Sequence, residues 1–256
     1  MSPEERLRLL EGRISELERQ LQEVADVQAI ERLQYQYGYY LDKCLYEEVV
    51  QLFAHNSEVH FLRGIFKGIE GVRRLYLGRF KKRWAAGGNG PVYGHLLDHP
   101  QLQPVIHVAP DGLSARARFR SLMQVGVHRV AADTHPAGAF QRWESGLYEN
   151  QYVKEDGRWK IKVLNYRNFW LASYEEGWAN APIWEDYLSV CYPEDPDGPD
   201  ELEEPAWSMW PETSLFPFHY PHPITGQWVE STGGYPPREG PDGPAPAEGR
   251  PTDGHA

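Results

Sequence analysis

The sequence contains few cysteines and no long apolar stretch. Its two cysteines, Cys44 and Cys191, are too few for the disulfide framework of a small secreted domain, so they indicate a reducing compartment. No segment offers the roughly 18 consecutive apolar residues that a membrane-spanning helix requires, and no signal-peptide pattern is present. We therefore expect a cytoplasmic protein that does not insert into a membrane.

Basic residues are also scarce. The chain carries 26 Lys and Arg against 37 Asp and Glu, which gives a formal net charge of −11. Proteins that bind nucleic acid or an anionic membrane surface need clustered Lys and Arg. The one basic cluster, Arg79–Arg83, is short and suits the exposed face of an amphipathic helix. We therefore expect neither nucleic acid nor a membrane as a partner.

The first 25 residues predict an amphipathic helix. Ser2, Pro3 and Glu5 supply an N-cap, a proline at the first helical position and the acidic residue of a capping box. Apolar residues then recur at alternating spacings of three and four, which is the pattern of a short coiled coil: Leu7, Leu10, Ile14, Leu17, Leu21 and Val24. Such a stripe packs either on another subunit or on its own domain. We favour a contact between subunits.

A second helix is predicted to start at Asp26, which can act as its N-cap. Its apolar series runs from Val27 to Cys44 and contains the segment Tyr35–Asp42, where four tyrosines surround one carboxylate. Burial against aromatic rings raises the pKa of a carboxyl group, so Asp42 is a candidate general base and the phenols are candidate donors to substrate oxygens. The alternative is that the tyrosines are core residues and Asp42 is a helix-end residue.

Helical geometry constrains this segment. At about 100° per residue, Tyr37 and Asp42 lie roughly 140° apart around an unbroken helix. Both can line one pocket only if the helix ends or loosens near Leu41, or if the pocket wraps around the helix tip.

The rest of the first 170 residues changes from helical to strand-like periodicity. Short helices are predicted at Tyr46–Ala54 and Ile69–Trp84. Three hairpins are predicted from alternating patterns and turn residues: Glu58–Leu62 with Ile65–Lys67, Leu102–Ala109 with Ser114–Val125, and Phe140–Val153 with Arg158–Asn168. This order describes an α+β domain, residues 26–170, in which helices pack on a curved, mostly antiparallel sheet.

The remaining residues differ in composition. Residues 171–232 are rich in aromatics and are predicted to form an extended arm that docks on the domain or on a neighbouring subunit. Within this arm, residues 194–204 hold seven acidic and no basic side chains, so we expect that stretch to be solvated. Residues 233–256 are rich in Pro, Gly and Glu and are predicted to be disordered.

Three segments carry a family resemblance. The helix AIERLQYQYGYYLDKCLYEEVVQLF, the segment HPQLQPVIHVAPDGLSARARFR and the hairpin RWESGLYENQYVKEDGRWKIKVLNYR together resemble the SnoaL-like branch of the nuclear transport factor 2-like superfamily. They are similar to scytalone dehydratase, bile-acid 7α-dehydratase and hexachlorocyclohexane dehydrochlorinase. The resemblance covers about residues 5–170. It implies a cone-shaped α+β barrel with a pocket between the helices and the concave face of the sheet.

The resemblance also implies catalytic residues, with no cofactor and no metal. An Asp–His pair is expected, and it maps to Asp42 and His99, with His95 as the alternative histidine. A tyrosine five residues before the aspartate maps to Tyr37, and a basic residue on the last strand maps to Arg167. Further pocket residues are expected at Tyr40, His95, Phe119, Trp143 and Phe61. A zinc site at His95 and His99 is disfavoured, because Pro100 interrupts the helix that such spacing would need.

These residue types suit proton abstraction followed by loss of a leaving group. The sequence therefore predicts a lyase, most simply a dehydratase, that acts on a hydrophobic cyclic or aromatic small molecule. Carbon–carbon cleavage that releases formaldehyde from a lignin-derived aromatic diol is a further form of this hypothesis. An isomerase or polyketide cyclase, or a non-catalytic ligand-binding or assembly module, are the alternatives. A homo-oligomer, trimer or dimer, is expected.

Overall fold

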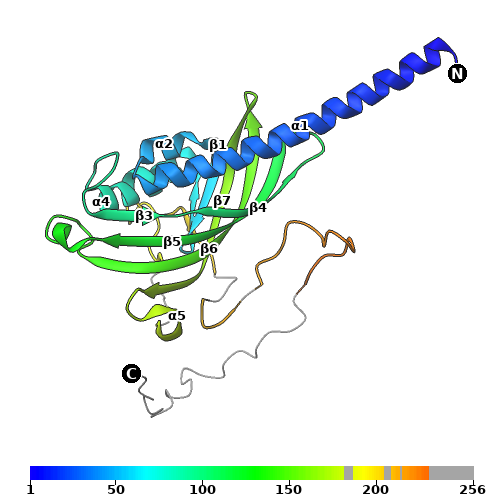
Figure 1. The fold of residues 1–256 in the computed structure, drawn as a ribbon. Coiled ribbons are helices and arrows are strands. Elements are labelled where there is room, and N and C mark those ends of the chain that lie inside the picture. The colour runs from blue at the N-terminus through cyan, green and yellow to red at the C-terminus, as the bar shows by residue number, and fades with distance from the viewer. Residues whose placement is uncertain (182–186, 205–208, 214, 231–256) are drawn as a thin grey trace, which may run out of the picture.

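The computed structural model describes residues 1–181, 187–204, 209–213 and 215–230. Its longest element is α1 (Pro3–Asp42), a helix of 40 residues that crosses the domain and extends well beyond it (Figure 1). The predicted capping box is confirmed, because Ser2 Oγ accepts from the Glu5 amide at 3.2 Å and Glu5 accepts from the Ser2 amide at 2.6 Å. The predicted second helix start is wrong, since α1 continues through Asp26 without a break.

Asp26 is a buried anchor of α1. Its carboxylate accepts from Lys154 Nζ at 2.8 and 2.9 Å and from Trp159 Nε1 at 2.8 Å. Both partners lie near the turn that joins the last two long strands, so no local sequence pattern could identify them. The residues before Asp26 are exposed, whereas Ile30, Leu33 and later residues on the same face are buried.

Four shorter helical elements follow α1. They are α2 (Tyr46–Gln51), α3 (Gly68–Arg73), the π-helical segment η1 (Arg74–Phe80) and α4 (Lys81–Ala85). Two single turns of helix come later, the 3-10 turn η2 (Arg129–Ala131) and α5 (Gly177–Asn180). The predicted helix from Ile69 to Trp84 is thus present as three consecutive segments. The helix predicted at Tyr46–Ala54 is shorter than expected, because the first strand begins at Phe53.

Eight strands form one curved sheet (Figure 1). Their bounds are β1 (Phe53–Phe61), β2 (Gly64–Lys67), β3 (His95–Asp98), β4 (Gln101–Val108), β5 (Ser114–Val127), β6 (Phe140–Glu155), β7 (Arg158–Ser173) and β8 (Glu201–Leu202). The order is β3-β5-β6-β7-β1-β2-β8, and β4 also pairs with β5. The three predicted hairpins are confirmed, and among the described strands only the β1–β7 pair is parallel. The predicted α+β architecture is therefore correct.

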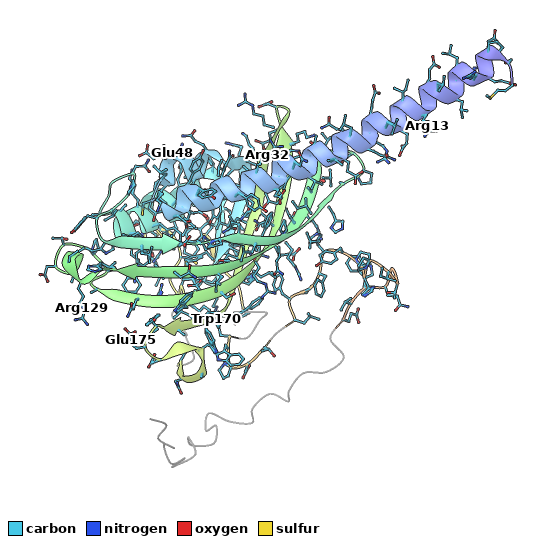
Figure 2. The ribbon with its side chains drawn as sticks, viewed as in Figure 1. Arg13, Arg32, Glu48, Arg129, Trp170 and Glu175 are labelled. Atoms are coloured by element: carbon cyan, nitrogen blue, oxygen red, sulfur yellow. The ribbon has the colours of Figure 1, made fainter. Side chains whose placement is uncertain are left out.

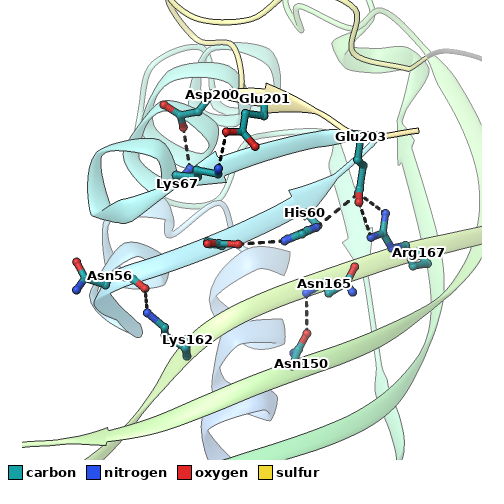
Figure 3. A network of polar contacts seen from close by, with 11 residues as sticks. Asn56, His60, Lys67, Asn150, Lys162, Asn165, Arg167, Asp200, Glu201 and Glu203 are labelled. Atoms are coloured by element: carbon teal, nitrogen blue, oxygen red, sulfur yellow. Dashed lines mark hydrogen bonds and ion pairs between the residues drawn. The ribbon is translucent and has the colours of Figure 1, made fainter. Parts of the chain in front are cut away.

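The acidic part of the arm is bound to the domain by ion pairs, so the prediction that residues 194–204 are solvated is wrong (Figure 3). Each of five acidic residues meets a basic side chain from a different position of the body. The pairs are Asp195 with Arg79, Asp197 with Lys82, Asp200 with Arg74, Glu201 with Lys67 and Glu203 with Arg167. The basic partners are far away in the sequence, which is why local composition suggested a solvated stretch.

A later part of the arm also docks on the outer face of the sheet. Arg118 on β5 donates to the carbonyl groups of Phe216 and Pro217, and its guanidinium lies 4.3 Å from the ring centre of Phe218. His219 contacts Glu149 on β6. The prediction of a docked aromatic arm is confirmed for these residues. The predicted disordered tail, residues 233–256, lies outside the described residues.

Candidate active site

A cavity of about 220 Å³ lies between the helices and the concave face of the sheet. Its wall is mainly aromatic and aliphatic, and the lining residues that matter below are Tyr37, Phe61, Tyr76, Trp84, His95, His99, Arg142, Glu144, Tyr148 and Tyr166. An apolar cavity of ~150 Å³ can hold benzene. The cavity is therefore large enough for one substituted ring.

Strand alternation decides which side chains reach this cavity. On β6, Arg142, Glu144 and Tyr148 line it, because successive side chains of a strand point to opposite faces. On β7, Leu164 and Tyr166 line it for the same reason. The intervening residues of both strands face the outer side of the sheet.

Glu144 is a buried carboxyl group in the cavity wall. Its side chain is 7% exposed, and its Oε1 accepts a hydrogen bond from the Tyr166 hydroxyl at 2.7 Å. Burial raises the pKa of Glu144, and the hydrogen bond from Tyr166 and the charge of Arg142 only partly oppose this effect. A carboxyl group with a raised pKa in a cavity is a candidate for proton transfer.

Gly146 makes room for this contact. It lies between Glu144 and Tyr148 on β6, and a Cβ atom added there would come within 2.5 Å of the Tyr166 ring. The ring of Tyr166 therefore lies directly against the backbone of the neighbouring strand. Only glycine permits this close approach.

His99 lies in the break between β3 and β4 and is 4% exposed. Its Nε2 is 2.9 Å from the Tyr148 hydroxyl oxygen, and its Nδ1 is 3.3 Å from Gln101 Nε2. Burial lowers the pKa of His99 to about 4, so the imidazole is neutral at neutral pH. One of its nitrogens then carries a hydrogen and the other accepts one.

A chain of buried amides determines which nitrogen accepts. The Asn165 backbone N–H can only donate, and it donates to Asn150 Oδ1 at 3.0 Å (Figure 3). Asn150 Nδ2 must then be the group that donates to Gln34 Oε1, at 3.0 Å. In turn Gln34 Nε2 donates to Gln101 Oε1 at 2.7 Å. Each amide orientation follows from the one before it.

The last link of this amide chain sets the tautomer of His99. Because its oxygen is used by Gln34, Gln101 presents its NH₂ group to His99 Nδ1. Nδ1 therefore accepts, and the hydrogen resides on Nε2, where it is directed at the Tyr148 oxygen. Tyr148 can therefore donate its own hydrogen, either to the Tyr37 hydroxyl, with which it also interacts, or to a ligand in the cavity that both residues line.

Two further tyrosines form a second polar pair in the wall. The hydroxyl oxygens of Tyr37 and Tyr76 are 3.0 Å apart, and both side chains are buried. Burial raises the pKa of Tyr37 to about 12 and also raises the pKa of Tyr76 well above its ordinary value. Both phenols are therefore protonated at neutral pH and can donate to an oxygen of a ligand.

His95 and Trp84 form another part of the wall. The His95 ring is stacked on that of His135, with centroids 5.3 Å apart and planes 6° apart, and its centroid is 5.6 Å from that of Trp84. Burial lowers the pKa of His95 to about 4. Both ring nitrogens of His95 are buried and lack a hydrogen-bond partner among the described residues. They are free to bind a polar group of a ligand.

No group of three or more His, Cys, Asp and Glu side chains that could hold a metal ion occurs in the described part of the chain.

Comparison with protein families settles the relationship of this chain. Residues 22–165 match the model of the SnoaL-like domain. The chain belongs to the SnoaL-like domain family. Its fold is nuclear transport factor 2-like, as the sequence resemblance implied. The matched range includes the cavity-lining residues of α1, β1, β3, β5 and β6. Tyr166 on β7, the exposed first part of α1 and the arm lie outside it.

Several solved structures are similar to this SnoaL-like chain. A scytalone dehydratase-like protein from Novosphingobium aromaticivorans shares 22% identity over 60% of this chain and 90% of its own, with a TM-score of 0.46. The type 2 hexachlorocyclohexane dehydrochlorinase LinA shares 17% sequence identity over 60% of this chain and 92% of its own, with a TM-score of 0.48. The association domain of C. elegans CaMKII shares 19% sequence identity over 56% of this chain and 96% of its own, with a TM-score of 0.40. No curated protein matches the chain.

The SnoaL-like cavity brings together four of the residues predicted from the sequence. Tyr37, His95, His99 and Phe61 line it. Asp42 does not, although it lies close by: its Oδ2 is 3.4 Å from the backbone nitrogen of His99, and its Oδ1 is buried with no partner among the described residues. The expected contact between the Asp42 carboxylate and the His99 imidazole is replaced by the contact of that imidazole with Gln101.

Helix geometry explains the position of Asp42. α1 stays helical through Asp42, so Tyr37 and Asp42 keep the wide angular separation of an unbroken helix. Tyr37 faces the cavity and Asp42 faces the chain before β4. Burial raises the pKa of Asp42 to about 7 against the lowering effect of the His99 amide.

The other predicted pocket residues lie elsewhere. Arg167 and Trp143 occupy outward positions of β7 and β6, and Arg167 is paired with Glu203 of the arm. Phe119 is on the inner face of β5, but it packs against Tyr35 in the core rather than beside the cavity. Tyr40 is half-buried against the core and does not line the cavity.

Sequence reasoning missed Glu144, Tyr148, Tyr166 and Gln101. A signal for Glu144 was present, because in the segment RWESGLY it shares the parity of Tyr148 and so points to the same face of a strand. A charged residue at an inward strand position is unusual and suggests a functional role. The contact with Tyr166 depends on strand pairing and had no local signal.

Proposed function

We propose that this SnoaL-like domain is a lyase that removes a leaving group, in the simplest case water, from a hydrophobic cyclic or aromatic small molecule. The observation that carries the proposal is the convergence of two proton-transfer centres on one mainly apolar cavity. Glu144 with Tyr166 forms one centre, and Tyr148 with His99 forms the other. Elimination needs a base for a carbon-bound proton and an acid for the departing oxygen.

In the proposed reaction, the Glu144 carboxylate takes a proton from a substrate carbon. The electron pair of that C–H bond forms the new double bond, and the bond from the neighbouring carbon to its hydroxyl oxygen breaks. The oxygen leaves with the bonding pair and takes the hydrogen of Tyr148, which yields water. The His99 Nε2–H stabilises the resulting phenolate. Transfer of the proton from Glu144 back to Tyr148 through the released water restores both groups.

The cavity wall supports a ring-shaped substrate with oxygen substituents. Aromatic residues supply flat apolar surface, and Tyr37 and Tyr76 supply phenolic donors. His95 offers two ring nitrogens that have no hydrogen-bond partner within the described part of the chain, and these could bind a further polar group. Arg83 and Arg142 also line the cavity, so an acidic substituent would be favoured near them.

The test compares the wild type with three variants on a mixture of cyclic and aromatic hydroxy compounds, followed by mass spectrometry. We expect a product that has lost water, no such product from Glu144→Gln, and normal turnover by Glu155→Gln, a control at the exposed end of the same strand. Asp42→Asn tests the base that the resemblance implied, and we expect it to remain active. If Glu144→Gln were active and Asp42→Asn inactive, the base would be Asp42 and not Glu144.

The same experiment separates the alternatives. Loss of formaldehyde instead of water would indicate carbon–carbon cleavage of a hydroxymethyl-bearing substrate. A product of unchanged mass would indicate an isomerase or cyclase. Binding of aromatic ligands without turnover would contradict the lyase proposal and favour a ligand-binding module.

A further inference from the structure

The first part of α1 carries an apolar stripe that nothing in the described chain covers. Every residue from Met1 to Ala25 is exposed, and the helix projects away from the sheet with its side chains surrounded by solvent (Figure 2). The six apolar residues of the stripe are between 48% and 70% exposed: Leu7, Leu10, Ile14, Leu17, Leu21 and Val24. An exposed stripe of this length on an otherwise well-packed protein indicates a binding surface.

The stripe has the periodicity of a coiled coil. Leu7, Ile14 and Leu21 occupy a positions of the heptad, and Leu10, Leu17 and Val24 occupy d positions. A stripe restricted to a and d is narrow. A helix that lies on a membrane surface has a wider apolar face and a basic polar face, whereas acidic residues are common on the other faces of this segment. The pattern therefore favours another helix as the partner.

The charges beside the stripe are complementary to those of a second, parallel copy of the same helix. Arg6 and Arg13 occupy g positions, and Glu11 and Glu18 occupy the e positions that follow them. In a parallel pair, each g residue faces the next e residue of the other helix, so every Arg faces a Glu. In an antiparallel pair, g faces g and e faces e, which would bring like charges together.

These four charges are available for such contacts. None of them forms an ion pair with another described residue, in contrast to Arg19, which is already paired with Glu16 and Glu23 on its own helix. We propose that the stripe is a parallel, in-register coiled-coil interface between copies of this chain. It lies outside the segment that matches the SnoaL-like domain and does not depend on the proposed activity.

Because α1 is fixed to the domain, the interface would also determine where the domains lie in the assembly. The helix continues without a break from the stripe into the cavity wall at Tyr37, and the buried pairs of Asp26 with Lys154 and Trp159 hold it to the domain. A parallel coiled coil would therefore hold the domains at the same end of the assembly.

The first experiment measures the mass of the full-length protein by light scattering and sedimentation. We expect a wild type of two or more copies and a monomeric Leu10→Asp/Leu17→Asp variant. Leu9→Asp is the matched control, because Leu9 is 63% exposed on the same helix but lies off the stripe. It should assemble like the wild type. The proposal would be overturned if the wild type were monomeric or if the Leu10→Asp/Leu17→Asp variant still assembled. It would also be overturned if Leu9→Asp lost assembly to the same extent as that variant.

The second experiment tests orientation. A variant with Arg6→Glu, Arg13→Glu, Glu11→Arg and Glu18→Arg exchanges the charges of the g and e positions. Parallel pairing predicts that this variant assembles with itself but not with a differently tagged wild type, since mixed pairs would place Arg against Arg and Glu against Glu. Antiparallel pairing predicts the opposite. Co-purification of the two chains after mixing in denaturant and refolding would overturn the parallel arrangement.

Discussion

Tyr166 on β7 donates its phenolic hydrogen to Glu144 on β6, and the two oxygen atoms are 2.7 Å apart. The contact is buried and lies in the cavity wall. It stabilises the charged form of a carboxyl group whose pKa burial raises. Burial is therefore the largest influence on the pKa of Glu144, and the Tyr166 phenol is the main group that opposes it.

Tyr166→Phe should shift the pH dependence of activity. Removal of the phenol removes a hydrogen bond that lowers the pKa of Glu144, so that pKa should rise further. The acid limb of kcat/KM should then move to higher pH, while activity at high pH should be less affected. A pH–rate profile from about pH 5 to about pH 9 measures this shift. An unchanged acid limb would mean that Glu144 is not the group that titrates.

Gly146→Ala should disturb the same contact by steric means. The added Cβ would come within 2.5 Å of the Tyr166 ring, so the ring or the strand must move. We expect a loss of about 1–3 kcal/mol in the free energy of unfolding, which is typical of overpacking. Activity should fall with it. Chemical denaturation measures the first effect, and Gly12→Ala, at an exposed helical site with open space around it, is the control.

Gln34→Leu should break the amide chain that orients His99. The substitution would take away the donor to Gln101 Oε1 and the acceptor of the Tyr152 hydroxyl, and each such buried group costs about 1–3 kcal/mol. It should also weaken the preference of His99 for the tautomer with hydrogen on Nε2. Nitrogen-15 NMR of the histidine ring reports that tautomer directly. Gln28→Leu, an exposed site on the same helix, should change stability by less than about 0.5 kcal/mol.

Asp42 should make stability depend on pH in a defined direction. Burial raises its pKa from 3.8 to about 7, so between these values the folded state binds more protons than the unfolded state. The contribution of Asp42 to stability is therefore greatest at low pH and is lost as pH rises toward 7. Asp42→Asn should remove this trend. The stability of the variant relative to the wild type should therefore increase as pH rises. Thermal unfolding of both proteins across this range provides the comparison.

Arg167 should be important for the docking of the arm. Arg167 is 5% exposed, and its guanidinium forms two contacts with Glu203, at 2.5 and 3.1 Å. Burial alone would raise the pKa of Glu203, but His60 and Arg167 together lower it to about 2. Arg167→Met leaves that carboxylate with His60 as its remaining partner among the described residues and should destabilise the protein, by less than the roughly 3–5 kcal/mol typical of a fully buried pair that loses one member. The double variant Arg167→Met/Glu203→Met should recover much of the loss in denaturation experiments.

Local patterns predicted several elements of this protein, and the resemblance predicted its family. The capping box at Ser2, the heptad stripe from Leu7 to Val24 and the three hairpins are each encoded within a few neighbouring residues. The resemblance identified Tyr37, His95, His99 and Phe61, all of which line the cavity. Asp26 shows the limit of such patterns, because its type suggested a cap while its partners are 128 and 133 residues away.

The sequence by itself therefore determined the α+β class, the three hairpins and the apolar stripe of α1, since helical and strand periods are local properties of the chain. Tertiary structure alone decided which ionisable groups meet. Glu144 meets Tyr166 through the pairing of β6 with β7, and Gln34 reaches Gln101 across 67 residues. A pKa or a tautomer is set by burial and by partners that strand pairing and packing bring together. For that reason Asp42, the most prominent acid in the sequence, lies beside the cavity while Glu144 lies within its wall.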